Sequence, residues 1–394
     1  MTPAARVQAA IELLDEIVEG ARSGGAAADT LIARYFKTRR YAGSKDRRAV
    51  RELVYRAIRR SGDRPLSGRA AMIGLAQEEA ELTQLFDGSP HGPAPIAADE
   101  TAASASVVPA WLIERFDPLL GGDELEALLG RAPLDLRVNR LKGHLEEALA
   151  ALPEARPTPL SPIGLRLPEG SRVEEAEAWR SGLVEIQDEG SQLLALGCGA
   201  KPGQILIDLC AGAGGKTLAL AGEMANEGRI IASDADRSRL ARLGPRLERA
   251  GVSIVETRLL DPGKELEALG DLRGAADLVL VDAPCSGTGT WRRNPETRWR
   301  LTPDRLERLV ALQAHLIDVA AELVRPGGLL VYAVCSLLAE EGRGQAAAFG
   351  GRRSAFVSER ASMAGGRSAG DGHLLTPARD GTDGFFVAMW RAPC

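Results

Sequence analysis

The sequence has few cysteines, and their spacing fits neither a disulfide framework nor a metal site. Only five occur among 394 residues, and no two form a Cys-x-x-Cys pair. An odd and scattered set argues against structural disulfides and against a cysteine-type zinc site, and it favours a reducing compartment. We therefore expect a cytoplasmic protein without a metal.

Long apolar runs are also missing. The opening MTPAARVQAAIELLDEIVEG is interrupted by Glu12, Asp15 and Glu16, so it lacks the apolar core of a signal peptide. No stretch approaches the roughly 20 apolar residues that a membrane-spanning helix needs. We expect a soluble monomer with no membrane partner.

An overall positive charge, which would suggest nucleic-acid binding, is absent as well. The net charge is −5, but between Lys37 and Arg64 there are eleven Lys or Arg against three acids. Fields of exposed charges fade within roughly 10 Å at ordinary salt, so a local basic patch can attract phosphate on an acidic protein. The same pattern is equally typical of an arginine-rich, solvated helix face.

Hydrophobic periodicity divides the chain into four parts. Residues 1–87 show helical spacing only, residues 88–109 are a Pro/Ala/Ser-rich linker without periodicity, and residues 110–186 mix helices and strands in a small α+β module. Residues 187–394 alternate strands and helices, which predicts a doubly wound α/β sheet that binds ligands at the carboxyl ends of its strands. The final GFFVAMW is expected to form an antiparallel edge strand, and MAGGRSAGDG to be irregular.

The glycine-rich turn DLCAGAGGKT fits neither common phosphate-binding motif. A Walker A loop would need glycine at Cys210, and a dinucleotide fingerprint would need its third glycine at Thr217. What remains is a tight turn from Gly212 to Gly215 that presents free amides at a helix N-terminus. Alone, such a turn is as often a structural loop as a binding site.

Two acids at strand ends favour a binding role for this turn. Asp234 ends the second strand, where a carboxylate can hydrogen-bond a ribose diol, and Asp261 ends the third, where it can meet an adenine amino group. A nucleoside cofactor without an essential phosphate fits this pattern. We therefore predict S-adenosylmethionine.

Two of the five cysteines follow strands: Cys285 in ADLVLVDAPCSGTG and Cys335 in GGLLVYAVCSLLAEEG. A single strand-end cysteine is usually a small buried hydrophobe, which is our interpretation of Cys198 and Cys394. The segments LIDLCAGAGGKT, VDAPCSGTGTWRRNPETRW, LVYAVCSLLAEEG and TDGFF together resemble, in order and spacing, the motifs of the Sun/Nop family of RNA cytosine-5 methyltransferases. The resemblance extends through LRVNRLK and GLVEIQDEGSQLLAL, and more weakly to the N-terminus, which is similar to the antitermination factor NusB.

The resemblance implies a fold and an activity. The expected fold is a Rossmann-like methyltransferase domain (187–394) with an all-helical NusB-like RNA-binding domain (1–87), a linker (88–109) and a small RRM-like bridging module (110–186). The expected activity is transfer of a methyl group from S-adenosylmethionine to carbon 5 of a cytidine in RNA, with small-subunit ribosomal RNA as the expected substrate. Because that carbon is a poor nucleophile, a thiolate first adds to carbon 6, which divides one difficult step into easier ones.

The resemblance also assigns roles to residues. Cys335 corresponds to the nucleophile, Cys285 to the residue that helps break the adduct, and Asp282 to the group that stabilises charge on the cytosine. Lys216 supplies positive charge that favours thiolate. The predicted cofactor-binding residues are Cys210 (through its backbone), Ala211, Gly212, Ala213, Gly214, Gly215, Lys216, Asp234, Asp261 and Asp282.

The segment RRNPETRWR follows the first cysteine loop and suggests RNA contact. Arg292, Arg293, Arg298 and Arg300 can hold a phosphate backbone, and Trp291 or Trp299 can stack on a base. The alternative is a salt-bridged loop with buried tryptophans. The target base must leave its stack to reach a thiol, so we expect a loop or unfolded RNA as the substrate form.

Three positions depart from the family pattern, which usually has Pro at Ala213, Thr at Val334 and Asn at Gly342. None of them removes a reacting group.

A different class of function remains open, namely a catalytically weak or silent RNA-binding protein on a methyltransferase scaffold. A P-loop NTPase is disfavoured by the missing glycine. A DNA cytosine methyltransferase is disfavoured because it uses the Pro-Cys cysteine as nucleophile and has no second strand-end cysteine.

Overall fold

The computed structural model describes all 394 residues, which form two compact units. The helical unit comprises residues 1–116, 120–130 and 290–303, and the sheet unit comprises residues 117–119, 131–289 and 304–394. None of the helices is long and apolar enough to cross a membrane.

The helical unit is built around a long first helix. Its elements are α1 (Pro3–Ser23), α2 (Ala28–Thr38), α3 (Ser44–Arg60), α4 (Gly68–Glu78), α5 (Ala80–Thr83), the 3₁₀ helix η1 (Ala110–Arg115), α6 (Gly122–Ala127) and the 3₁₀ helix η5 (Pro295–Arg300). Thr2 caps α1 by accepting a hydrogen bond from the Ala5 amide at 3.2 Å, and Pro3 occupies the first turn, where its missing N–H costs nothing. The predicted all-helical character of the N-terminal region is confirmed.

The predicted linker, residues 88–109, contains no helix or strand, yet it is held against the helices. The Ala103 amide donates to the Ala70 carbonyl at 2.9 Å, and the Ser106 amide donates to the Arg60 carbonyl at 2.9 Å. Glu100 also accepts from the Arg69 guanidinium at 2.7 Å. The segment therefore packs against the helical unit along its length instead of forming a free linker.

A segment distant in sequence completes the core of the helical unit. Trp299, 2% exposed, joins the hydrophobic core formed by α1 to α4, and its indole N–H donates to the Ser61 carbonyl at 2.7 Å. Arg298 is also buried, and its guanidinium donates to the carbonyls of Ile58, Arg59 (2.8 Å) and Val107 (2.5 Å). These bonds satisfy backbone oxygens at the end of α3 that would otherwise be buried without partners.

The sheet unit begins with a small antiparallel sheet in the order β2-β3-β1-β4. Its elements are β1 (Leu134–Val138), α7 (Leu145–Ala151), β2 (Arg156–Pro157), β3 (Gly164–Leu167), η2 (Val173–Glu175), α8 (Glu177–Arg180) and β4 (Val184–Ile186). Asn139 links this sheet to the rest of the unit, because its side-chain amide donates to the Ala250 carbonyl at 2.9 Å. Glu185 adds ion pairs to Arg246 and Arg249.

A large sheet follows, in the order β11-β12-β13-β9-β8-β5-β6-β7, with β10 paired to β13. Its strands are β5 (Ile205–Asp208), β6 (Arg229–Asp234), β7 (Val255–Leu259), β8 (Ala276–Asp282), β9 (Val324–Val334), β10 (Val357–Glu359), β11 (Arg367–Ala369), β12 (Gly372–Leu375) and β13 (Phe385–Arg391). Strands β5 to β9 are parallel to their neighbours, whereas β13 runs antiparallel to β9. The predicted Rossmann-like α/β architecture is confirmed.

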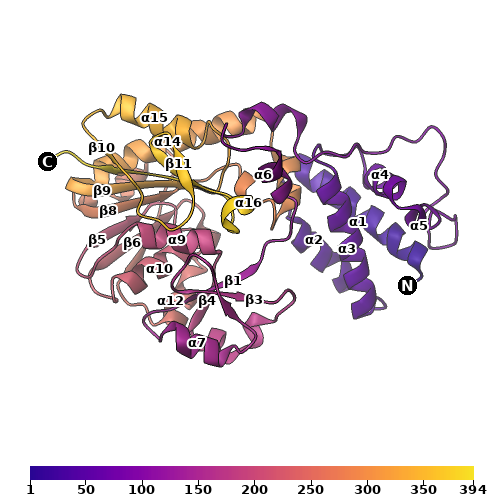
Figure 1. Ribbon diagram of the computed structural model, residues 1–394, viewed down its shortest axis with the longest axis horizontal. Coiled ribbons are helices and arrows are strands. Elements are labelled where there is room, and N and C mark those ends of the chain that lie inside the picture. Colours follow the sequence, from indigo (N-terminus) through magenta and orange to yellow (C-terminus); the bar gives the residue numbers. More distant parts are fainter. The chain divides into compact units, whose positions relative to one another are not determined.

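Helices cover both faces of this sheet (Figure 1). They are α9 (Glu189–Gly197), α10 (Gly215–Glu223), α11 (Arg237–Leu240), α12 (Leu243–Ala250), α13 (Glu265–Ala268), α14 (Pro303–Leu323), α15 (Arg343–Arg352) and α16 (Pro377–Asp380), with the short 3₁₀ helices η3 (Gly270–Leu272) and η4 (Thr288–Thr290). Figure 1 shows α9, α10 and α12 on one side of the strands and α14 and α15 on the other. The strand order reverses between β5 and β8, which creates the switch point where such sheets bind ligands.

Two local expectations differ from the structure. Strand β13 is not an edge, because β12 pairs with its outer side. Residues 363–372 were expected to be irregular but contain β11, which forms a hairpin with β12.

We predict that Arg298→Ala lowers the free energy of unfolding by about 3 kcal/mol, because it leaves buried carbonyls at the end of α3 without donors. Urea denaturation measures this value. The control is Arg34→Ala, an exposed arginine of α2 without a partner, which should change stability by less than about 0.5 kcal/mol. Equal stability of the two variants would show that the Arg298 hydrogen bonds contribute nothing.

Candidate functional site

The predicted site residues lie at one edge of the large sheet. Because β5, β6, β7, β8 and β9 are parallel, the residues that follow them emerge at the same edge. The glycine-rich turn follows β5, Asp234 ends β6, Asp282 ends β8 and Cys335 follows β9 directly. The topology thus gathers side chains that are far apart in sequence.

The glycine-rich turn connects β5 to α10 and is tied to the end of β6. The Ala211 amide donates to the Ser233 carbonyl at 2.8 Å, and the Gly212 amide donates to the Asp234 carboxylate at 2.8 Å. Gly214 has φ +84°, and a Cβ there would collide with Leu243, so the turn requires glycine at this place. The Ala213 carbonyl accepts from Arg246 at 2.6 Å.

The two predicted nucleoside-binding acids keep acceptor capacity. Asp234 accepts from the Gly212 amide with one oxygen and from the Asp236 amide at 2.7 Å with the other, which leaves a lone pair on each oxygen. Asp261 lies just beyond β7, is exposed, and its carboxylate has no hydrogen-bond partner within the protein. Both carboxylates can therefore accept bonds from a ligand.

A third carboxylate, Asp208, is buried beneath the turn. It accepts from the Thr217 hydroxyl at 2.7 Å with one oxygen, while its other oxygen is buried without a partner. The pKa of Asp208 is raised to about 7, mainly by burial and also by the nearby carboxylates of Asp282 and Asp234, while the Thr217 hydrogen bond and Lys216 act in the opposite direction. This end of the sheet therefore favours a positively charged ligand.

Lys216 and Asp282 form an ion pair between the turn and the end of β8. The lysine nitrogen lies 2.6 Å from the carboxylate. Burial by itself would lower the pKa of Lys216, but the Asp282 charge outweighs it and the pKa is raised. Lys216 is therefore a fixed positive charge at the site, and Cys335 is among the groups that interact with it electrostatically.

Cys285 and Cys335 lie in contact, with their sulfurs 3.4 Å apart. The hydrogen bond to Cys335 is the largest cause that raises the pKa of Cys285 well above its usual range, and burial adds to it. Either sulfur can be the donor of this bond, so the contact couples the protonation of the two thiols.

The remaining cysteines have no such setting. Burial raises the pKa of Cys198 to about 12, and burial also raises the pKa of Cys210 well above the usual range of a thiol. Cys394 is exposed at the chain end. Only Cys285 and Cys335 combine mutual contact with a neighbouring lysine.

A buried glutamate that the sequence analysis passed over lies beneath both cysteine loops. Glu341 is fully buried and follows Cys335 by six residues. Its carboxylate accepts from the Ser286 amide at 2.8 Å and from the Ser336 hydroxyl at 2.5 Å. The sequence signal was a carboxylate among apolar residues in LVYAVCSLLAEEG, but nothing in the sequence showed which of its two glutamates turns inward.

The TDGFF segment also packs against these loops. The Gly384 amide donates to the Gly289 carbonyl at 2.9 Å, and the Gly289 amide donates to the Cys335 carbonyl at 3.1 Å. A Cβ at Gly289 would lie 2.1 Å from the Gly384 carbonyl oxygen, so the two backbones approach closely only because both positions are glycine. The Asp383 amide donates to Asp188, the residue that caps α9.

Two of the departures from the family pattern fit their surroundings. A Cβ at Gly342 would lie 3.0 Å from the Phe386 ring, so this chain has little room there for the usual Asn side chain. Val334 is fully buried in β9 and pairs with Phe386 of β13, an environment that suits an apolar side chain.

The predicted RNA-contacting arginines belong to the helical unit, and burial corrects part of that expectation. Arg298 and Arg292 are 1% and 7% exposed, so neither presents its guanidinium to solvent. Trp291 and Trp299 are buried too, which excludes base stacking in this conformation. Arg300 donates to the Gly25 and Ala26 carbonyls at 2.8 and 2.5 Å, and Arg293 is half-buried. The segment matches the alternative of a loop with buried tryptophans.

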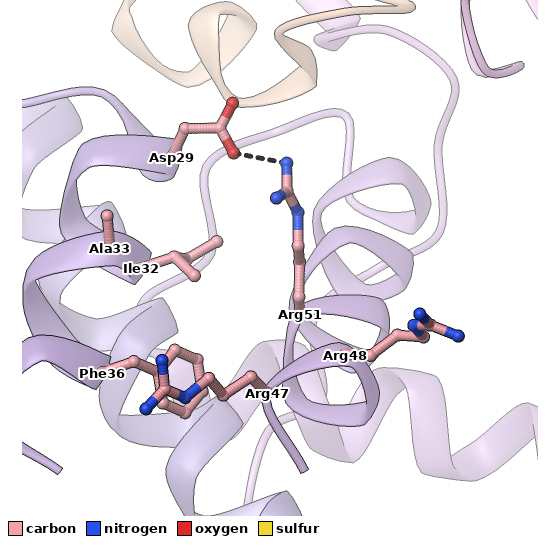
Figure 2. Close-up of a pocket in the computed structure, with 7 residues that line it drawn as sticks. All are labelled: Asp29, Ile32, Ala33, Phe36, Arg47, Arg48 and Arg51. Atoms are coloured by element: carbon pink, nitrogen blue, oxygen red, sulfur yellow. Dashed lines mark hydrogen bonds and ion pairs between the residues drawn. The ribbon is translucent and has the colours of Figure 1, made fainter. Parts of the chain in front are cut away.

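Part of the basic cluster over residues 37–64 is exposed and borders a pocket between α2 and α3 (Figure 2). The cavity of about 490 Å³ is lined by Asp29, Ile32, Ala33, Phe36, Arg47, Arg48 and Arg51. Arg51 pairs with Asp29 at 2.8 Å, and Arg47 donates to the Ala42 carbonyl at 2.9 Å. Arg48 has no partner, nor have Lys37, Arg40 and Lys45 nearby, so the surface carries uncompensated positive charge.

The chain is similar to known methyltransferases. Residues 196–391 match the family described as 16S rRNA methyltransferase RsmB/F. A probable ribosomal RNA small subunit methyltransferase B from Synechocystis sp. is 33% identical over 299 residues, which cover 71% of this chain and 66% of that protein. Ribosomal RNA small subunit methyltransferase B from Salmonella newport is 34% identical over 288 residues, which cover 71% of this chain and 65% of that protein. The matched part thus spans slightly less than two thirds of either relative.

A solved structure extends the likeness over the whole chain. The crystal structure of PH0851 has a TM-score of 0.75 and 26% identity, and the alignment covers 99% of each chain. The family match alone includes the entire large sheet from β5 to β13 with both strand-end cysteines. On these grounds the chain belongs to the RsmB/F family of methyltransferases.

Proposed function

We propose that this protein transfers a methyl group from S-adenosylmethionine to carbon 5 of a cytidine in RNA, with small-subunit ribosomal RNA as the substrate. The observation that carries the proposal is the contact between the two strand-end thiols, 3.4 Å apart, in the same edge as the Lys216–Asp282 pair. Methyltransferases that act directly on a nucleophilic atom need no thiol. Two thiols in contact therefore favour a substrate carbon that must be activated covalently.

The residues present fit S-adenosylmethionine. A Cβ added at Gly212 meets nothing within 4 Å, so open space adjoins the turn. Asp234 and Asp261 follow adjacent strands at this edge, and Asp208 is buried beneath the turn. These carboxylates suit a cofactor with a positive sulfonium and ammonium group. We infer that Asp234 holds the ribose, Asp261 the adenine, and the amides of the turn the remainder. When bound, the cofactor supplies the methyl group.

The protein's own groups carry the remaining steps. The Cys335 sulfur forms a bond to carbon 6 of the cytosine, and the ring electrons that this releases allow carbon 5 to take the methyl group. We assign Asp282 to a hydrogen bond with the amidine edge of the base, with its carboxylate held by Lys216 at 2.6 Å. Loss of the carbon 5 proton and cleavage of the bond to Cys335 restore the double bond. We assign Cys285 to this release.

The helical unit has a role in this proposal as an RNA-binding domain. Its α2–α3 surface carries Lys37, Arg40, Lys45 and Arg48 without acidic partners, and phosphate contacts of this kind contribute affinity without reading sequence. The alternative function, a silent RNA-binding protein, would use this surface and leave the thiols idle. The thiol contact favours the enzyme.

The first test separates the two cysteines. Cys335→Ala cannot form the adduct, so methylation and covalent capture of RNA should both vanish, whereas Cys285→Ala should attack and then stall with RNA attached. A denaturing gel with labelled ribosomal RNA and S-adenosylmethionine reads both outcomes. Capture by Cys335→Ala alone would reverse the roles, and full activity in both variants would exclude the covalent mechanism. Bisulfite sequencing of the RNA identifies the modified cytidine.

The second test concerns the cofactor. Asp234→Ala should weaken S-adenosylmethionine binding by about 1–3 kcal/mol, the range for a hydrogen bond to a charged group. Isothermal calorimetry measures the change, and circular dichroism checks that the variant is folded. Glu227→Ala, an exposed acid at the opposite end of the unit's β6, serves as the control. Unchanged affinity in folded Asp234→Ala would remove this residue from the site.

The third test concerns RNA binding by the α2–α3 surface. Replacing Lys37, Arg40 and Arg48 with Gln should reduce the slope of log affinity against log salt by about 2, because each phosphate contact contributes roughly 0.7 on a single strand. A matched control replaces Arg325, Arg352 and Arg360, which are likewise exposed, with two of them paired to acids. If both triple variants keep the parent slope, the α2–α3 surface is only a solvated helix face.

A further inference from the structure

Glu341 joins the two cysteine loops through one carboxylate. Its Oε2 accepts from the hydroxyl of Ser286, the residue after Cys285, and from the hydroxyl of Ser336, the residue after Cys335. Its Oε1 accepts from the Ser286 amide at 2.8 Å. One side chain therefore bonds the residue that directly follows each thiol.

A second buried side chain completes the arrangement. Gln313 of α14 donates to Glu341 Oε1 at 2.8 Å and to the Pro284 carbonyl at 2.9 Å. Because Pro284 precedes Cys285 and Ser286 follows it, the first cysteine is held from both sides. Thr288 extends the network, since its hydroxyl accepts from the Leu337 amide at 2.8 Å and lies 3.2 Å from the Ser336 hydroxyl.

The carboxylate of Glu341 accepts four hydrogen bonds. The Ser286 backbone N–H and the Gln313 side-chain NH2 group donate to Oε1, and the two serine hydroxyls donate to Oε2. No cation lies among these partners. A neutral amide of the same shape would turn an N–H toward donors and break part of the cluster.

We propose that Glu341 is a positioning residue that holds the Cys285 and Cys335 sulfurs in contact by fixing both loops at once. It touches neither thiol, and it acts through Ser286 and Ser336. Its position keeps the two cysteine loops together even though they follow different strands. This inference rests on the proposed function, because holding the thiols in contact matters for catalysis only if both thiols take part in the reaction.

The geometry itself can be tested without RNA or cofactor, so this test can fail while the methyltransferase proposal stands. The probe is dibromobimane, a reagent that becomes fluorescent when it bridges two neighbouring thiols. In a Cys394→Ser background, which removes the exposed cysteine, Glu341→Gln should slow bridging by about ten-fold or more, because small displacements of reacting atoms have large effects on rate. Peptide mass spectrometry confirms that Cys285 and Cys335 are the bridged pair.

The neighbouring carboxylate supplies the matched control. Glu340→Gln removes the same charge one residue earlier. The two serines bond Glu341 and not Glu340, so this change should alter the bridging rate by less than about two-fold. Bridging of folded Glu341→Gln at the parent rate would overturn the proposal. If Glu341→Gln does not fold, Ser286→Ala and Ser336→Ala each remove one donor from the carboxylate. Both should slow bridging, and parent rates in both would also overturn it.

Two further measurements, one of activity and one of thiol alkylation, distinguish a positioning role of Glu341 from a general loss of structure in the variant. Glu341→Gln should lower kcat while KM for RNA and the affinity for S-adenosylmethionine stay near the parent values, because the carboxylate lies at neither predicted binding surface. The pH profile of Cys285 alkylation should move to lower pH, since the negative charge of Glu341 is among the causes that raise the pKa of that thiol. A merely destabilised protein would show neither this shift nor the split between kcat and KM.

Discussion

Strands β8 and β9 pair in parallel, with Asp282 opposite Ala333, and the site depends on this register. Because both strands end at the same level, the loops that begin at Ala283 and Cys335 start side by side. A shift of the register by one residue would send the side chains of one strand to the opposite face. The thiol contact and the hydrogen bond from Gly289 to Cys335 both require the two strands to end together.

Much of the large sheet was predictable because its strands are short apolar runs with turn residues at their ends. The turn after β5, the acids after β6 and β8, and both cysteines stand at strand ends in the sequence, so their convergence follows from parallel topology alone. Glu341 could not be identified in this way. Its partner Ser286 is 55 residues away, and only the packed loops show that Glu341 turns inward.

The arginine-rich segment RRNPETRWR shows a case in which the sequence suggested a ligand-binding role that the structure does not support. Arginine is usually exposed, so four arginines in nine residues favoured a ligand surface. The guanidinium of Arg298 instead donates hydrogen bonds to backbone carbonyls up to 240 residues earlier in the chain, at the end of α3. Five rigid donors make arginine well suited to such a place, because they satisfy several buried carbonyls from one side chain. Whether an arginine meets phosphate or its own backbone depends on the helix end beside it, which composition does not reveal.

The hydrogen bond between the two thiols links the acidity of one to the chemical state of the other. The contact with Cys335 is the largest cause that raises the pKa of Cys285. A sulfur that has formed a bond to carbon carries no negative charge, so alkylation of Cys335 would remove that part of the shift. In the proposed mechanism, bond formation at one thiol would therefore lower the pKa of its neighbour without any movement of the backbone.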